Sequence, residues 1–126
     1  MIVLLRLIAW LLAAAVTFAT LAPPSLRPHS SFGQNGEHAL AFILVGFAFG
    51  VAYAQRRLAV SAIAVVMVGL LELLQFWAPG RHARLEDFLV DALAACVGIA
   101  LSAAHAWAMT RYRENPDAIT GEDPAE

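Results

Sequence analysis

The stretch that decides the fold is residues 69–98, GLLELLQFWAPGRHARLEDFLVDALAACVG. Two apolar runs flank a short polar segment, and the Pro79–Gly80 pair within that segment cannot continue a helix. Because Leu and Ala dominate both runs and no strand-like alternation is present, the stretch predicts two helices joined by a turn. Charged and amide side chains lie within and beside these apolar runs: Glu72, Gln75, Arg81, Arg84, Glu86, Asp87 and Asp91.

The whole chain shares the apolar character of this hairpin. Of its 126 residues, 60% are hydrophobic and 14% are charged, and the mean hydropathy is +0.68. Soluble domains average about 45–50% apolar and about 25% charged residues, so this composition is typical of membrane proteins. The net charge of −2 and the absence of a basic stripe argue against nucleic acid as a partner. The single cysteine, Cys96, excludes an intrachain disulfide.

Four apolar segments are long enough to cross a bilayer. At about 1.5 Å per residue each covers roughly 27–34 Å, compared with a hydrocarbon thickness of about 30 Å. We therefore predict an all-α integral membrane bundle of four transmembrane helices, at residues 2–22, 38–55, 58–78 and 87–109. They form one domain of residues 1–110, and the acidic tail of residues 111–126 is expected to be disordered and cytoplasmic.

The first apolar segment has two interpretations. It could be a cleaved signal peptide with Arg6 as its charged region, or a retained transmembrane helix. Its long apolar run and the Pro23–Pro24 pair directly after it favour the retained helix, since these prolines would hinder cleavage.

The distribution of arginines predicts the orientation. With four spans, five arginines lie on one side and three on the other: Arg6, Arg56, Arg57, Arg111 and Arg113 against Arg27, Arg81 and Arg84. The positive-inside rule then predicts that both termini are cytoplasmic and that residues 79–86 face the extracytoplasmic side.

This topology brings polar residues of three predicted helices to one level. Glu72 lies about 10 Å below the Pro79 turn, and Asp91 lies one helical turn beyond Asp87, while His38 opens the second helix on the same side. Ionisable side chains are costly in hydrocarbon and usually face the bundle interior, so they are candidates for function. The candidate binding residues are His38, Glu72, Gln75, Arg81, Arg84, Asp87 and Asp91.

The same residues resemble the VanZ-like membrane proteins over residues 36–101. The family pattern is a His opening one span, then E-x-x-Q, a P-G-R turn, and D-x-x-x-N or D at the head of the next span. It maps onto His38, Glu72, Gln75, Pro79, Gly80, Arg81, Asp87 and Asp91. The chain departs from the family at Glu37, where Lys is frequent, at Asp91, where Asn is common, and at Ala94, where Gly is frequent.

The resemblance implies a small multipass protein of the bacterial inner membrane. The founding member of the family is associated with low-level resistance to the glycopeptide teicoplanin. Resistance to a drug that acts on the cell wall is compatible with an outward-facing site, so the resemblance also implies a connection with the cell envelope.

Three functions fit these residues. The preferred hypothesis is binding or handling of a lipid or a lipid-linked envelope molecule, in which Arg81 and Arg84 would hold phosphate or carboxylate groups. The second is a structural or accessory subunit whose polar residues fix helix packing. The third is an intramembrane hydrolase or transferase using His38, Glu72 and Asp91 as general base, acid and orienting group, or as ligands of a divalent metal.

The expected partners follow from the preferred hypothesis. They are the lipids of the bilayer and a lipid-linked envelope precursor, and a transport function would require a homo-oligomer, because four spans leave little room for a channel. The sequence carries no HExxH motif, so we expect neither a metal nor another cofactor.

Overall fold

Helices make up nearly all of the chain that the structure describes. The structure is a computed structural model that describes residues 1–21, 34–75 and 85–114. Within these ranges there are four α-helices and one short 3-10 helix: α1 (Ile2–Leu21), α2 (Gln34–Ala52), η2 (Ala54–Arg56), α3 (Arg57–Gln75) and α4 (Leu85–Glu114). The predicted all-α class is confirmed.

Both predicted boundaries of the second helix were wrong. The second helix begins at Gln34 rather than at His38, because its polar first turn continues the same helix, and it ends at Ala52 rather than at residue 55. It ends there because Tyr53 leaves the helical region of backbone conformation, with φ −126° and ψ 46°, and η2 follows.

The last helix is longer than predicted. It begins at Leu85 and continues to Glu114, so residues 111–114, which we assigned to the tail, are helical. Arg111 and Arg113 lie in its final turn, where cationic side chains stabilise the negative end of the helix dipole. The rest of the predicted tail, residues 115–126, lies outside the described residues.

Three helical segments are long and apolar enough to cross a membrane. They are Ile2–Leu21 with 20 residues, Ala54–Leu74 with 21 residues and Leu85–Glu114 with 30 residues. The apolar part of α2, Gly36–Ala52, is shorter than these three. Large apolar side chains are exposed on all four helices, and Leu89, Leu93, Val97 and Leu101 form such a row along α4. A surface of this kind is that of a membrane-embedded protein, because lipid rather than water covers it.

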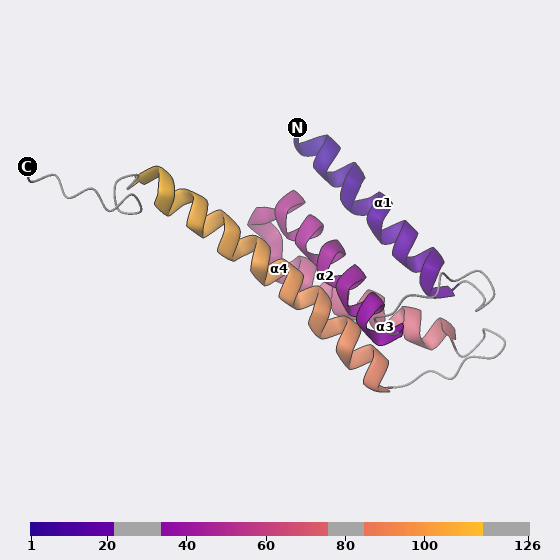
Figure 1. Cartoon of the computed structure of the whole chain (residues 1–126). Helices are drawn as coiled ribbons and strands as arrows, with labels where there is room; N and C mark the ends of the chain where they lie inside the picture. Colours follow the sequence, from indigo (N-terminus) through magenta and orange to yellow (C-terminus); the bar gives the residue numbers. More distant parts are fainter. Residues whose placement is uncertain (22–33, 76–84, 115–126) are drawn as a thin grey trace, which may run out of the picture.

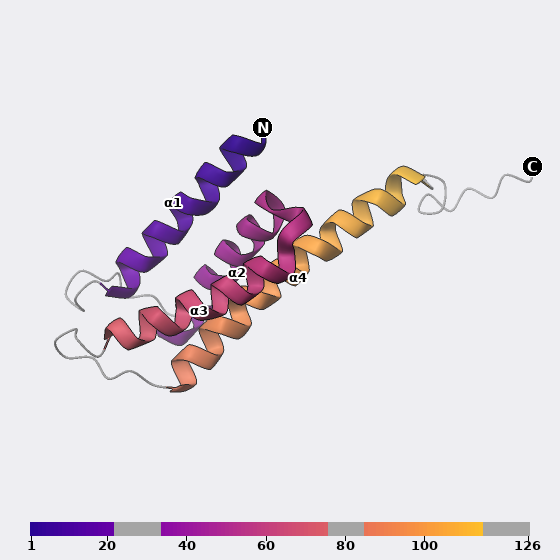
Figure 2. The same cartoon turned by 180° about the vertical axis from the view of Figure 1, so that it is seen from behind.

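The helices run side by side, and α2 packs most extensively against α4 (Figure 1). The opposite view shows α3 crossing the face of α2 and α4 that is hidden in the first (Figure 2). The bundle therefore has two chemically distinct ends. At the arginine end α1 begins, α2 passes into α3, and α4 ends; it carries Arg6, Arg56, Arg57, Arg111 and Arg113. At the opposite, acidic end lie Glu37, Glu72, Glu86, Asp87 and Asp91.

Small residues allow the close approach of α2 and α4. A Cβ atom built at Gly46 would overlap the backbone carbonyl of Ala95, and one built at Gly98 would overlap the backbone carbonyl of Ile43. At Gly50 an added Cβ would overlap the hydroxyl of Ser102. Hence each of these glycines is required by contact with the other helix, as expected for small-residue packing in membranes.

The side chain of Arg57 fastens the arginine end of this pair. Its Nε donates a hydrogen bond to the carbonyl of Gly50 at 3.2 Å, and its Nη2 donates to the carbonyl of Ser102 at 3.5 Å. The Gly50 carbonyl is in the last turn of α2, where carbonyl groups lack a partner within the helix. Arg57 thus joins the end of α2, the start of α3 and the middle of α4.

The packing of α2 on α4 predicts the effect of adding one methyl group. We expect Gly98→Ala to lower the free energy of unfolding by about 1–3 kcal/mol, because the backbones must separate to admit the Cβ atom. The measurement is titration with sodium dodecyl sulfate in mixed micelles, with helix content as the signal.

Gly69→Ala is the matched control. A Cβ atom at Gly69 would meet only the Phe88 ring, at 3.4 Å, which is ordinary van der Waals contact. Its free energy of unfolding should equal that of the parent or exceed it by up to about 1 kcal/mol, because Ala is the better helix former. Equal unfolding curves for the two variants would contradict the close approach at Gly98.

Candidate functional site

A small hydrophobic layer lies in the half of the bundle nearer the acidic end. Phe42 of α2, Val68 of α3 and Ala95 of α4 are buried there, and Val16 of α1 packs against them. Each of the four α-helices therefore contributes an apolar residue to the same layer.

A polar layer lies one helical turn nearer the acidic end. Each helix places a polar residue four positions from its member of the hydrophobic layer, and residues four apart share a helix face. We define the polar layer as Thr20, His38, Glu72 and Asp91. The periodicity of the helices thus directs four polar side chains from four helices to the same inward-facing level.

His38 of α2 and Asp91 of α4 approach each other within this layer. The Nδ1 atom of His38 lies 3.9 Å from Oδ2 of Asp91, which is within ion-pair range and beyond hydrogen-bond range. Asp91 is only 6% exposed. A buried carboxylate of this kind is costly unless a polar group accompanies it, so His38 is the partner that α2 supplies to α4.

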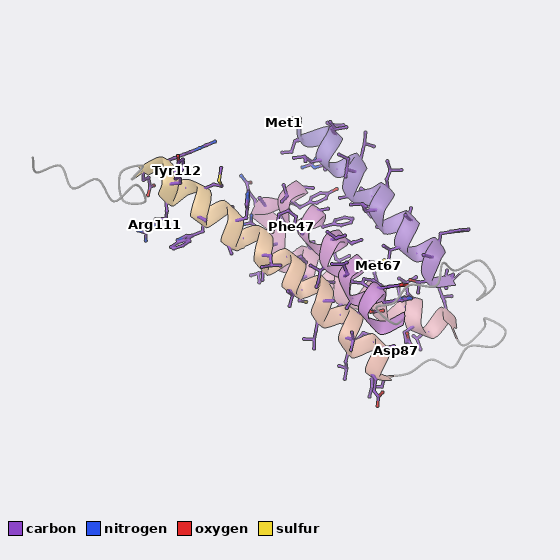
Figure 3. The ribbon with its side chains drawn as sticks, in the orientation of Figure 1. Met1, Phe47, Met67, Asp87, Arg111 and Tyr112 are labelled. Carbon is purple, nitrogen blue, oxygen red and sulfur yellow. The ribbon has the colours of Figure 1, made fainter. Side chains whose placement is uncertain are left out.

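Two further carboxylates act on the same position. The carboxyl groups of Asp87 and Glu72 both lie near enough to Asp91 to interact with it electrostatically. Asp87 lies in the first turn of α4, at the opposite end of that helix from Arg111 and Tyr112 (Figure 3). The site therefore combines one histidine with three carboxyl groups, and its described part is acidic.

The structure gives less information about the other three predicted site residues, Gln75, Arg81 and Arg84. Gln75 is the last residue of α3. Arg81 and Arg84 lie outside the described residues. The structure thus brings together His38, Glu72, Asp87 and Asp91 of the predicted set, and Gln75 belongs to the helix that carries Glu72.

Thr20 is a member of the polar layer that the sequence analysis missed. It is 2% exposed, in the last turn of α1. Thr20, His38 and Glu72 each take part in a further interaction within the molecule. The sequence shows a hydroxyl group near the end of an apolar segment. Its membership of the polar layer depends on the register of α1 against the other helices, which the sequence alone does not give.

The chemistry of the layer is that of hydrogen-bond acceptors. Carboxylates accept hydrogen bonds from hydroxyl and ammonium groups, and an imidazole can both accept and donate. Among the described residues, no three His, Cys, Asp or Glu side chains gather in a way that could hold a metal ion.

Comparison with known proteins gives no family assignment. The chain matches no protein-family model, and neither the curated proteins nor the solved structures give a significant match. The fold and the site together define the class: a helical, membrane-embedded protein with a buried polar layer near one end of its bundle.

The contact between α2 and α4 predicts an energetic coupling between His38 and Asp91. In a double-mutant cycle with His38→Gln and Asp91→Asn, we expect a coupling free energy of about 0.5–2 kcal/mol, the range for polar pairs between membrane helices. The free energy of unfolding of the parent, the single variants and the double variant supplies the four corners of the cycle.

The control is a second double-mutant cycle, in which His105 rather than His38 is mutated together with Asp91. His105 packs its ring edge against Phe47, and it lies about four helical turns from Asp91 along α4. His105→Gln and Asp91→Asn should therefore be additive within about 0.5 kcal/mol. A His38 cycle as additive as this control would show that the pair carries no interaction energy.

Proposed function

We propose that this chain is a multipass protein of the bacterial inner membrane, related to the VanZ-like family, that binds or handles a lipid or lipid-linked envelope molecule. The polar layer at the extracytoplasmic face is the proposed binding site. The observation that carries the proposal is the buried Asp91 carboxyl group, set opposite His38 and near two further carboxylates. Ionisable groups at membrane depth usually mark a site of binding or transport.

The orientation rests on the charge at the two ends of the bundle. The described arginines lie at the end where α2 passes into α3, and this end is proposed to be cytoplasmic. The apolar part of α2 has 17 residues, the lower limit for crossing a bilayer. Four spans with both termini in the cytoplasm then put the polar layer in the outer leaflet.

The chemistry of the layer favours a particular kind of head group. Its carboxylates would accept hydrogen bonds from the hydroxyl or ammonium groups of a sugar or amine, and Arg81 and Arg84 would supply bidentate contacts to phosphate. A lipid-linked envelope precursor combines such groups with an apolar tail that stays in the bilayer. A link to glycopeptide resistance would follow from handling such a molecule on the outer side.

One observation favours a structural role instead. The pair of His38 and Asp91 connects α2 with α4, the two helices that pack most extensively. In this alternative the polar layer only holds the helices in register.

Single substitutions separate the two functions. We expect Asp91→Asn, Glu72→Gln and Arg81→Ala to stay within about twofold of the parent in membrane abundance. The lipid-linked molecule that copurifies per protein should fall about tenfold, since a charge-assisted hydrogen bond contributes about 1.5–3 kcal/mol. Mass spectrometry of lipid extracts from the purified protein, normalised to protein, measures this ratio.

Glu86→Gln is the control, because Glu86 is an exposed carboxylate in the same turn of α4 as Asp87 and should change neither quantity. Disappearance of all three site variants from the membrane would support the structural role. Unchanged lipid content in an abundant Arg81→Ala protein would contradict the binding role.

The proposed orientation predicts which positions a membrane-impermeant maleimide can reach. In a Cys96→Ala background, we expect Ser30→Cys and His82→Cys to be labelled in intact spheroplasts. Gln55→Cys and Ala125→Cys should be labelled only after lysis, because both positions would face the cytoplasm. Labelling of Gln55→Cys before lysis, with His82→Cys protected, would reverse the orientation and remove the outward-facing site.

A further inference from the structure

A second polar cluster lies at the arginine end of the bundle, far from the polar layer. The guanidinium carbon of Arg6 lies 4.9 Å from the centre of the Tyr53 ring, and the Nε1 of Trp10 donates a hydrogen bond to the Tyr53 hydroxyl at 3.2 Å. The Phe49 ring stacks on Tyr53 at 5.9 Å and meets the Trp10 ring edge-on at 5.3 Å. We call Arg6, Trp10, Phe49 and Tyr53 the Tyr53 cluster; it joins α1 to the end of α2.

Arg56 adds a second positive charge to this cluster. Its backbone N–H donates a hydrogen bond to the carbonyl of Tyr53 at 2.9 Å. The short helix η2 therefore places Arg56 one turn after Tyr53. Both Arg6 and Arg56 are exposed, whereas Arg57 is occupied by the carbonyls of Gly50 and Ser102. Neither Arg6 nor Arg56 forms an ion pair with a carboxylate among residues 1–21, 34–75 and 85–114.

The aromatic rings hold one of these charges in place without neutralising it. A guanidinium group whose face lies over a ring keeps N–H groups that can donate to phosphate or carboxylate oxygens. Holding Arg6 on α1 against Tyr53 also reduces the conformational freedom that the side chain would lose on binding an anion. The cluster is thus a positively charged position with its donors available.

The surroundings of the cluster indicate where an anion would come from. Ile2, Val3, Leu7 and Trp10 are large exposed side chains around Arg6 on α1, and Leu58 is exposed just beyond the two arginines of η2 and α3. In a membrane-embedded chain these side chains face acyl chains. An anion joined to acyl chains can therefore contact the arginines and the apolar surface together.

We propose that the Tyr53 cluster and Arg56 bind the head-group phosphate of an anionic phospholipid, whose acyl chains lie along the exposed face of α1. This site is separate from the polar layer and does not depend on the function proposed for it. Each basic side chain at a membrane surface contributes about a fivefold preference for an anionic lipid, so two should give a preference of about 25-fold.

Quenching of Trp10 by brominated lipid tests the proposal. With Trp77→Phe and Trp107→Phe, Trp10 is the remaining tryptophan of the chain. The protein is placed in vesicles of phosphatidylglycerol and phosphatidylcholine in equal amounts, with bromine on the acyl chains of one lipid or of the other. Brominated phosphatidylglycerol should quench Trp10 more strongly, corresponding to a relative binding constant of about 25-fold in favour of phosphatidylglycerol.

Arg6→Gln/Arg56→Gln should abolish the difference between the two lipids. The matched control is Arg111→Gln/Arg113→Gln, which removes the same charge from the last turn of α4 and should leave the difference intact. Helix content of each variant is measured in the same vesicles, and the comparison uses variants that match the parent.

Four results would overturn the proposal. The first is equal quenching by both lipids in the protein with its arginines intact, which needs no variant. The second is a difference that survives in Arg6→Gln/Arg56→Gln. The third is a difference lost equally in the α4 control, which would show an effect of net charge alone. The fourth is removal of the difference by millimolar inorganic phosphate, which would show a site for free phosphate.

Discussion

The close approach of α2 and α4 is the constraint on which the rest of the structure depends. Gly46 and Gly98 lie against the backbone of the opposite helix, and no larger residue fits there. In lipid, apolar burial gives little driving force for helix association, because acyl chains are as apolar as the side chains they replace. Van der Waals contact between backbones and a few polar contacts must supply the stability.

This contact also determines where the polar residues meet. His38 lies two helical turns before Gly46, and Asp91 lies about two turns before Gly98, so the register that seats the glycines brings His38 opposite Asp91. Near the other end, Arg57 binds carbonyls on both helices. The two helices are therefore held together by the contact between His38 and Asp91 on one side of the glycines and by Arg57 on the other.

The sequence predicted those features of the structure that follow from the type of a single residue in an apolar helix. Carboxyl groups within apolar helices predicted an inward-facing cluster, and the structure brings His38, Glu72, Asp87 and Asp91 together. Gly46 and Gly50 are four residues apart, a spacing typical of close helix packing in membranes, and both lie against α4. These inferences needed only helix periodicity and the cost of a charge in hydrocarbon.

Features that depend on tertiary contacts could not be predicted in this way. In the sequence, Arg57 served only to predict the orientation. In the structure its guanidinium group binds the carbonyls of Gly50 in α2 and Ser102 in α4. This double contact could not be predicted without knowing that the two helices lie side by side. Thr20 joins the polar layer only through the register of α1. The continuation of α4 to Glu114 was missed because its last turns are polar and exposed, so apolar periodicity ended before the helix did.

The unequal chemistry of the two ends bears on both proposed lipid sites. In the described part of the acidic end Asp91 lies opposite His38, and the carboxyl groups of Asp87 and Glu72 lie near enough to Asp91 to interact with it, so ionised carboxylates there would repel phosphate. A phosphorylated head group at that end would need cations from elsewhere in the chain, and Arg81 and Arg84 connect α3 to α4 in the sequence. At the arginine end Arg6 and Arg56 lie beside lipid-facing side chains without a carboxylate paired to them among the described residues. An ordinary anionic lipid therefore suits the arginine end, whereas the acidic end suits a ligand whose hydroxyl or ammonium groups, rather than its phosphate, enter the bundle.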